Sequence, residues 1–273
     1  MSVSFGPFGF ALSHLIFFAA CAAALGLASF LGRNSNNSKN KVSDTLFLSL
    51  IVAVLVARCS FVLRFSDLYL ASPKQILNIR DGGFDILMGL TAGLLFIAYK
   101  AWRQRTLVKP LLIATLAGLL VYGGGFYGQQ VLKQQHPFVP EITLNTLSAK
   151  PVPLAQAFHG QGLVINLWAT WCPPCVREMP VLMEAQTQWP NMAIVPVNQG
   201  ESVAAIKGFF HAHSLAFEHA LVDSRSQLSQ AVGSSVFPTT LFFDANGLLV
   251  DSHIGELSVP RLAAGIQKIE AAK

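Results

Sequence analysis

Four long apolar segments occupy the first half of this chain, at residues 8–31, 45–62, 84–98 and 110–127. A membrane-spanning helix needs about 20 mostly apolar residues, and each segment approaches that length. The whole chain is 52% hydrophobic and only 12% charged, whereas about a quarter of the residues of a soluble protein are charged. The pattern predicts a helical membrane domain with about four transmembrane helices over residues 1–132, and a second domain over residues 133–273.

The first segment is expected to be a retained helix, because no Lys or Arg precedes it and it exceeds the apolar core of a signal peptide. Basic residues are concentrated in the connections after the first and third spans: Arg33, Lys39, Lys41, Lys100, Arg103, Arg105 and Lys109. The second connection is less basic, with Arg64, Lys74 and Arg80. The positive-inside rule then predicts a multi-pass membrane protein whose first and third connections are cytoplasmic and whose second domain faces the periplasm or its equivalent.

Those juxtamembrane residues account for the net charge of +5. The second domain has no basic stripe interleaved with aromatic residues, so a nucleic-acid partner is not expected. The expected non-protein partner is the lipid bilayer.

Short apolar runs alternate with helical patterns from residue 138 onward. Strands are expected at 138–144, 163–168, 192–197 and 217–222, and helices at 154–158, 176–189, 202–213, 227–232 and 259–271. The runs 240–244 and 248–254 form a predicted hairpin, because Asn246-Gly247 between them suits a tight turn. This alternation predicts an α/β domain with a mixed central sheet and helices on both faces.

Two cysteines, Cys172 and Cys175, lie in the sequence Trp-Cys-Pro-Pro-Cys between the expected strand 163–168 and the expected helix 176–189. A thiol at a helix N-terminus is stabilised as the thiolate, which is the attacking species in disulfide exchange. The spacing therefore predicts a redox-active disulfide. A zinc site is the alternative, but zinc needs about four ligands, and Cys21 and Cys59 lie in predicted spans. No metal or other cofactor is expected.

The stretch from Asn166 to Pro180 resembles the active site of membrane-anchored thioredoxin-like proteins of the TlpA/ResA/DsbE type. The resemblance covers about residues 137–273 and implies a thioredoxin-like fold with thiol–disulfide oxidoreductase activity. Residues 236–239 are similar to a family loop whose proline is cis and lies against the dithiol. Residues 244–247 match the hairpin turn that follows it, and Glu178 matches an acid near the active site.

The resemblance also implies a substrate-binding role for residues beside the dithiol: Trp171, Pro173, Phe237 and Pro238. The backbone at Phe237 would pair with a substrate chain. Trp168 and Trp171 are expected to be packing residues that frame the site. Two interpretations of Glu178 remain open, a first-turn acid that stabilises the helix dipole and a proton acceptor or donor for Cys175.

In the expected mechanism an exposed Cys172 attacks a substrate disulfide, and the more buried Cys175 resolves the mixed disulfide. The residues do not fix the direction of electron flow. The resemblance implies a disulfide reductase that a membrane-embedded electron donor recharges, with protein substrates such as apocytochrome c or copper-site assembly proteins. A dithiol oxidase or isomerase is the alternative.

The membrane half has a second resemblance. Residues 56–58, 73–77 and 80–84 are similar to a stretch of prolipoprotein diacylglyceryl transferase. That family continues its Gly-Gly segment with a His-Gly-Gly run that bears on catalysis, but residues 85–89 here read Asp-Ile-Leu-Met-Gly. We therefore expect a degenerate domain used as an anchor or docking platform. The alternative is a lipid-handling enzyme that the redox domain regulates.

Polar residues inside predicted spans are candidates for function. Arg58 and Asp85 either pair across the second and third spans or lie near the membrane interface. Cys21 and Cys59 either relay electrons across the membrane or pack as small residues. A docking module whose dithiol serves folding more than turnover is a further alternative.

Overall fold

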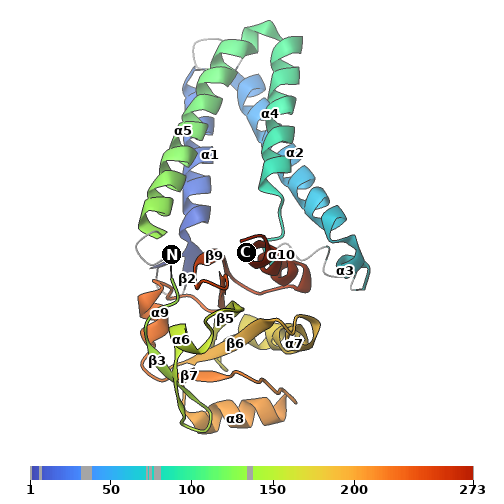
Figure 1. The fold of residues 1–273 in the computed structure, drawn as a ribbon. Coiled ribbons are helices and arrows are strands. Elements are labelled where there is room, and N and C mark those ends of the chain that lie inside the picture. The colour runs from blue at the N-terminus through green and yellow to red at the C-terminus, as the bar shows by residue number, and fades with distance from the viewer. Residues whose placement is uncertain are drawn as a thin grey trace. The chain divides into compact units, whose positions relative to one another are not determined.

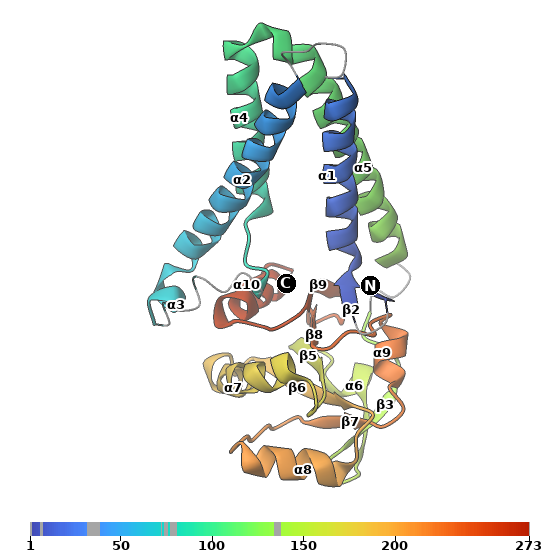
Figure 2. The ribbon, with the colours of Figure 1, turned by 180° about the vertical axis from the view of Figure 1, so that it is seen from behind.

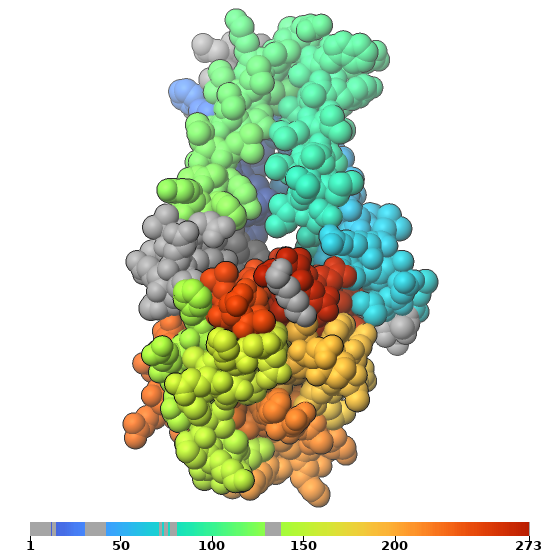
Figure 3. Space-filling view, in the orientation of Figure 1, coloured from blue at the N-terminus to red at the C-terminus, as the bar shows by residue number. Residues whose placement is uncertain are grey.

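The computed structural model describes residues 2–5, 8–31, 39–71, 73, 76, 81–133 and 138–272. It divides into two compact units, one comprising Leu12–Ile76 with Gly83–Leu132, and the other comprising Met1–Ala11, Leu77–Gly82 and Lys133–Lys273. The first unit is helical and the second is built around a sheet (Figures 1 and 2). Figure 3 shows the sheet unit from residue 138 onward in yellow-green to red. Arg33, Lys74 and Arg80, used above to predict the orientation, lie outside the described residues.

The helical unit contains five α-helices and a short 3₁₀ helix within its described residues: α1 (Leu12–Leu31), α2 (Lys39–Arg64), α3 (Ser66–Ala71), α4 (Ile86–Arg103), η4 (Arg105–Leu107) and α5 (Val108–Lys133). Three described helical segments are long and apolar enough to cross a membrane, namely Val42–Arg64, Ile86–Arg103 and Arg105–Gly128. In α1 the described apolar run is the shorter Leu15–Phe30, so the fourth span stays a prediction.

The first expected span begins later than the sequence pattern indicated. Residues 8–11 are not helical but form β2 (Phe8–Ala11), which pairs antiparallel with β1 (Ser2–Phe5). The ladder runs from Ser2 opposite Ala11 to Phe5 opposite Phe8. The segment Phe-Gly-Phe-Ala contains two aromatic residues, which favour strands, and a glycine, which weakens helices, so the helix starts at Leu12.

Helices α2 and α4 pack closely because α4 presents glycines to α2. A Cβ atom added at Gly89 would lie 2.7 Å from the Ala53 carbonyl oxygen and 2.8 Å from the Ala57 Cβ atom. One at Gly93 would lie 3.2 Å from the Ala53 Cβ atom. Small residues at such a crossing let two backbones approach, as is typical of helix pairs in membranes.

Of the two alternatives for Arg58 and Asp85, pairing across the spans is not seen within the described part of the helical unit. The Asp85 carboxylate caps α4 by accepting a hydrogen bond from the Met88 N–H at 3.1 Å. The Arg58 guanidinium donates to the carbonyl of Gly83 at 2.8 Å and to that of Ile76 at 3.0 Å. The acid thus lies at the start of its helix, where a carboxylate is favourable.

The sheet of the second unit has seven strands in the order β4-β3-β7-β6-β5-β8-β9. Their bounds are β3 (Thr143–Thr146), β4 (Pro151–Pro153), β5 (Gly162–Trp168), β6 (Met192–Gln199), β7 (Leu221–Asp223), β8 (Thr239–Phe243) and β9 (Leu249–Ile254). The three central strands β5, β6 and β7 are parallel, and all other pairs are antiparallel. The mixed sheet predicted from the sequence is confirmed.

Helices cover both faces of this sheet: α6 (Leu154–Ala157), α7 (Pro173–Gln188), α8 (Val203–Ala212), α9 (Gln227–Ala231) and α10 (Val259–Ala271). One core layer joins Val164 and Trp168 of β5 to side chains of α7, α8 and α10. The other joins the alternate residues Leu163, Ile165 and Leu167 to α6 and α9. Every residue of β5 is buried, as expected for a central strand between two layers.

Three expected elements of the sheet unit start three or more residues from the predicted position, and strand β4 was not predicted. The strand expected at 138–144 is wrong over most of its length, since Phe138 makes only an isolated bridge with Leu248 and β3 starts at Thr143. Pro140 lacks an N–H group and therefore interrupts a ladder. The run expected at 217–222 is a strand only from Leu221. Helix α7 starts at Pro173 instead of residue 176, because proline fits the first turn of a helix.

Candidate redox site

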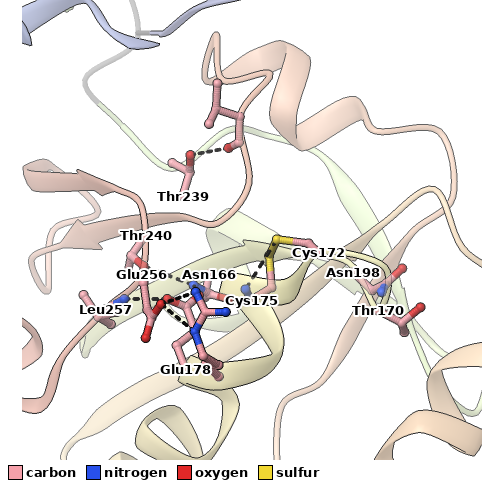
Figure 4. The surroundings of a disulfide bond; sticks show 12 residues. Asn166, Thr170, Cys172, Cys175, Glu178, Asn198, Thr239, Thr240, Glu256 and Leu257 are labelled. Carbon is pink, nitrogen blue, oxygen red and sulfur yellow. Dashed lines mark hydrogen bonds and ion pairs between the residues drawn. A yellow bond between two sulfur atoms is a disulfide. The ribbon is translucent and has the colours of Figure 1, made fainter. Parts of the chain in front are cut away.

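Cys172 is the N-cap residue of α7 and follows the C-terminal end of β5. Cys172 and Cys175 form a disulfide, with their Cα atoms 5.3 Å apart. The Cys172 Sγ atom accepts a hydrogen bond from the Cys175 N–H at 3.4 Å (Figure 4). Cys172 was expected to be exposed, but its exposed fraction is 4% in this disulfide form and that of Cys175 is 0%. The helix N-terminus still directs N–H groups at the first sulfur, which favours its thiolate.

The loop before β8 packs against the core cluster to which the dithiol belongs. The peptide bond between Phe237 and Pro238 is cis, as the resemblance implied. Phe237 packs against the core cluster that contains Cys172 and Cys175. The Thr239 hydroxyl donates to the Val236 carbonyl at 2.6 Å, which closes the loop across the proline (Figure 4).

The two tryptophans near the dithiol have different environments. Trp168 is fully buried and stacks on Phe210 with ring centroids 5.5 Å apart, so the packing interpretation holds for it. Trp171 is 67% exposed, and its ring centroid lies 6.1 Å from that of Phe237. Pro173 is also exposed. The packing interpretation therefore does not hold for Trp171, whose exposed side chain gives an accessible apolar surface one residue before Cys172.

Glu178 is fully buried on α7, five residues beyond the first residue of the helix. The interpretation as a first-turn acid is therefore wrong, because the helix starts at Pro173. Its Oε1 atom accepts from the Asn166 amide at 2.7 Å, and its Oε2 atom accepts from the Leu257 N–H at 2.7 Å (Figure 4). Burial raises the pKa of the Glu178 carboxyl to about 8, although both hydrogen bonds act to lower it.

The preceding residue, Arg177, binds the same loop as Glu178. Its Nε atom donates to the Glu256 carboxylate at 2.8 Å, and its Nη2 atom forms an ion pair with the same oxygen. Glu256 and Leu257 both belong to the connection between β9 and α10. Two consecutive residues of the active-site helix thus hold one loop in place.

The sequence analysis did not identify a second carboxylate, which holds the loop that precedes Cys172. Glu201, just beyond β6, accepts hydrogen bonds from the Thr170 N–H at 2.7 Å and from the Thr170 hydroxyl. The Asn198 side-chain amide donates to the same carboxylate at 2.7 Å. Thr170 lies between β5 and Cys172, so Glu201 fixes the loop that carries Trp171. The sequence offered no signal for this contact across 31 residues.

The sequence places Asn166 in the active-site stretch but does not indicate its contact with Glu178. The available signal was a polar residue inside an otherwise apolar strand. Among the described residues no cluster of three or more His, Cys, Asp or Glu side chains could hold a metal ion. Cys21 is partly buried in α1 and Cys59 is exposed in α2, and both interpretations of these cysteines, packing and electron relay, stay open.

Comparisons with known proteins match the two halves of the chain separately. Residues 137–252 match the AhpC/TSA family, and residues 1–129 match prolipoprotein diacylglyceryl transferase. The thiol–disulfide oxidoreductase ResA of Geobacillus thermodenitrificans is 32% identical over 146 residues, covering 53% of this chain and 82% of the relative. ResA of Bacillus anthracis is 26% identical over 171 residues, covering 61% of this chain and 98% of the relative.

Among solved structures, a secreted disulfide oxidoreductase of Mycobacterium tuberculosis, homologous to E. coli DsbE, matches with a TM-score of 0.43. It is 23% identical, and the match covers 46% of this chain and 95% of the other.

Proposed function

The chain belongs to the ResA family of thiol–disulfide oxidoreductases, and from this premise we propose that it is a protein-disulfide reductase whose redox domain faces the periplasm. The protein is membrane-anchored and is a redox enzyme that acts on disulfides. The observation that carries the proposal is the Cys172–Cys175 disulfide at the N-terminus of α7.

The reaction proceeds by two exchanges. The Cys172 thiolate attacks one sulfur of a substrate disulfide, so a mixed disulfide forms and the other substrate sulfur leaves as a thiolate. Cys175, deprotonated, then attacks the Cys172 sulfur and releases the second substrate sulfur. The substrate gains two electrons and the protein keeps the disulfide seen in the structure. A membrane-embedded electron donor returns the pair to the dithiol.

Glu178 supplies the proton exchange that the buried thiol needs. Cys175 is completely buried, and a thiol in apolar surroundings resists ionisation. The raised pKa of the Glu178 carboxyl, about 8, lets the group exist in both forms near neutral pH. It lies three residues after Cys175 on the same helix, and residues at this spacing are neighbours on one face. Glu178 therefore takes the proton from Cys175 and later returns it to solvent.

Substrate proteins dock on the apolar side chains of Trp171, Pro173 and Phe237. Pro238, which was expected in the same surface, is buried, and its role is to shape the loop that carries Phe237. An extended substrate segment pairs with the backbone at Phe237. This residue precedes the cis proline and packs against the core cluster that contains Cys172 and Cys175. Apocytochrome c and copper-site assembly proteins are the substrates that the family resemblance favours. The basic connections between spans support the periplasmic orientation, and the membrane half serves as an anchor.

The activity is tested with the full-length protein in detergent, by the rate of insulin disulfide reduction with dithiothreitol as the electron source. We expect Cys172→Ser to abolish turnover and Cys175→Ser to accumulate a mixed disulfide. The matched control is Cys59→Ser, an exposed cysteine on α2, which should retain full activity. Turnover that survives Cys172→Ser would contradict the mechanism.

The direction of electron flow needs a measurement in cells. Acid quench followed by alkylation of free thiols reports the redox state of Cys172 and Cys175. A mostly reduced pair supports the reductase. A mostly oxidised pair in cells with an intact donor would contradict it and favour a dithiol oxidase.

A further inference from the structure

Asn166 lies at the centre of the buried strand β5, between Ile165 and Leu167, and is completely buried. It stands opposite Thr240 in the antiparallel ladder with β8. A polar side chain at such a position costs free energy unless its hydrogen-bonding groups are satisfied. Its presence in this strand therefore needs a physical reason other than packing.

The orientation of the Asn166 amide indicates that reason. Its Nδ2 atom donates to Glu178 Oε1 at 2.7 Å and to Thr240 Oγ1 at 3.1 Å (Figure 4). Both amide hydrogens are thereby used. The Oδ1 atom is buried and has no hydrogen-bond partner in the described part of the chain. The amide thus leaves an acceptor unsatisfied while it donates to the carboxyl.

Few other groups favour a negative charge on Glu178. The Leu257 N–H donates to its second oxygen. Of the charged groups that face it, Arg177 on α7 favours the carboxylate and Glu256 in the loop after β9 opposes it. From β8 the neighbouring group is the neutral Thr240 hydroxyl. A short hydrogen bond to an ionised group is about twice as strong as one between neutral groups, so the Asn166 amide favours the carboxylate over the acid.

We propose that Asn166 is a positioning residue for disulfide exchange, whose side-chain amide keeps the buried Glu178 carboxyl able to ionise in the pH range where the thiols react. Glu178 as carboxylate accepts one proton from the Cys175 thiol, which leaves the thiolate that resolves the mixed disulfide. Glu178 then releases the proton to solvent. The consequence for turnover rests on the proposed function, but the ionisation of Glu178 in the oxidised protein does not.

The test uses the oxidised full-length protein in detergent and the infrared carbonyl band of a protonated, buried carboxyl. The band of Glu178 is the one that Glu178→Gln lacks. We expect Asn166→Leu, which removes the amide at similar volume, to move the midpoint of this band upward by about one pH unit, a tenfold change in proton affinity. The matched control Thr240→Val keeps the amide–carboxylate bond and should move it much less.

A purely structural role for Asn166 is excluded by a second readout. The pH at which insulin reduction reaches half its maximum should rise in Asn166→Leu, and this rise should vanish when the change is added to Glu178→Gln. If Asn166→Leu does not fold, Asn166→Thr removes the amide with a residue that suits strands.

An unchanged infrared midpoint, or an equal shift in Thr240→Val, would overturn the inference. If the wild-type protein does not reduce insulin, the proposed function is rejected. The infrared midpoint of Glu178 would still decide whether Asn166 favours its ionisation.

Discussion

Glu178 on α7 accepts a hydrogen bond from the backbone N–H of Leu257 at 2.7 Å, across 79 residues of sequence. This bond ties the helix that carries Cys172 and Cys175 to the connection between β9 and α10. Because the carboxyl is buried, the free energy of unfolding of the domain also depends on whether Glu178 is protonated. The active-site acid is therefore expected to have a thermodynamic signature as well as a chemical role.

Stability should fall as Glu178 is forced to ionise. Its pKa is raised from 4.5 to about 8 in the folded protein, so its contribution is complete below pH 4.5 and is lost as pH rises through 8. The total is roughly 5 kcal/mol. Glu178→Gln should therefore flatten the decline in the thermal unfolding midpoint between these pH values, measured by tryptophan fluorescence of the full-length protein. Glu218→Gln, at an exposed site, should leave the decline unchanged.

His253 should have the opposite dependence. Burial and then the Arg261 charge lower the pKa of this imidazole from 6.5 to about 4. Its contribution to stability is complete above pH 6.5 and is lost as pH falls toward 4, because only the unfolded chain takes up the proton. The expected loss is roughly 3 kcal/mol. His253→Gln should remove it in the same melting experiment, whereas the exposed control His211→Gln should not. Equal acid sensitivity of His253→Gln and wild type would contradict this assignment.

Glu201 should control the geometry of the nucleophile without touching it. Its carboxylate holds both the N–H and the hydroxyl of Thr170, two residues before Cys172. Small displacements of a reacting group are costly in rate, so Glu201→Ala should slow insulin reduction roughly tenfold. The exposed control Glu218→Ala should retain the wild-type rate. A wild-type rate for Glu201→Ala would show that the loop keeps its geometry without the hydrogen bonds from Thr170 to this carboxylate.

Trp171 should contribute to substrate binding and little to folding. Its side chain is largely exposed, and its ring lies near that of Phe237. Exposed aromatic residues often dominate protein–protein contacts, so Trp171→Ala should raise KM for insulin by about tenfold, equivalent to about 1.4 kcal/mol. The rate with a small-molecule disulfide should change little, and the melting midpoint should stay near that of wild type. A rate loss that is equal for both substrates would assign Trp171 to the chemistry instead.

Features that depend on residues close together in the sequence were predicted correctly. Helix α10 has the expected bounds, Val259–Ala271, because a local periodicity and the Ser258 cap define it. The turn between β8 and β9 was also predicted, because nearby residues define it. Asp244 accepts hydrogen bonds there from the N–H groups of Asn246 and Leu248. The dithiol was identified for the same reason, from residues that lie within four positions.

Contacts between distant segments could not be predicted. Strand β4, Pro151–Pro153, has two prolines in three residues, and only its pairing with β3 makes it a strand. The loop that holds Glu178 reaches it from Leu257, and Glu201 reaches Thr170 from beyond β6. Such pairs depend on strand order, which no local pattern encodes.

The packing of α2 against α4 gives a final prediction, for the membrane half. A Cβ atom at Gly89 would meet the Ala53 carbonyl oxygen at 2.7 Å, and a backbone atom cannot yield as a flexible side chain can. Gly89→Leu should therefore force the helices apart at a cost of about 1–3 kcal/mol and lower the temperature of aggregation in detergent.

The control for this change is Gly123→Leu on α5, where an added Cβ atom has no neighbour within 4 Å in the described structure. It should aggregate at the wild-type temperature, and equal effects of the two changes would contradict the packing argument. If the membrane half is only an anchor, Gly89→Leu should still reduce insulin at the wild-type rate below its aggregation temperature. A slower rate would show instead that the packing of α2 and α4 is coupled to Cys172 and Cys175.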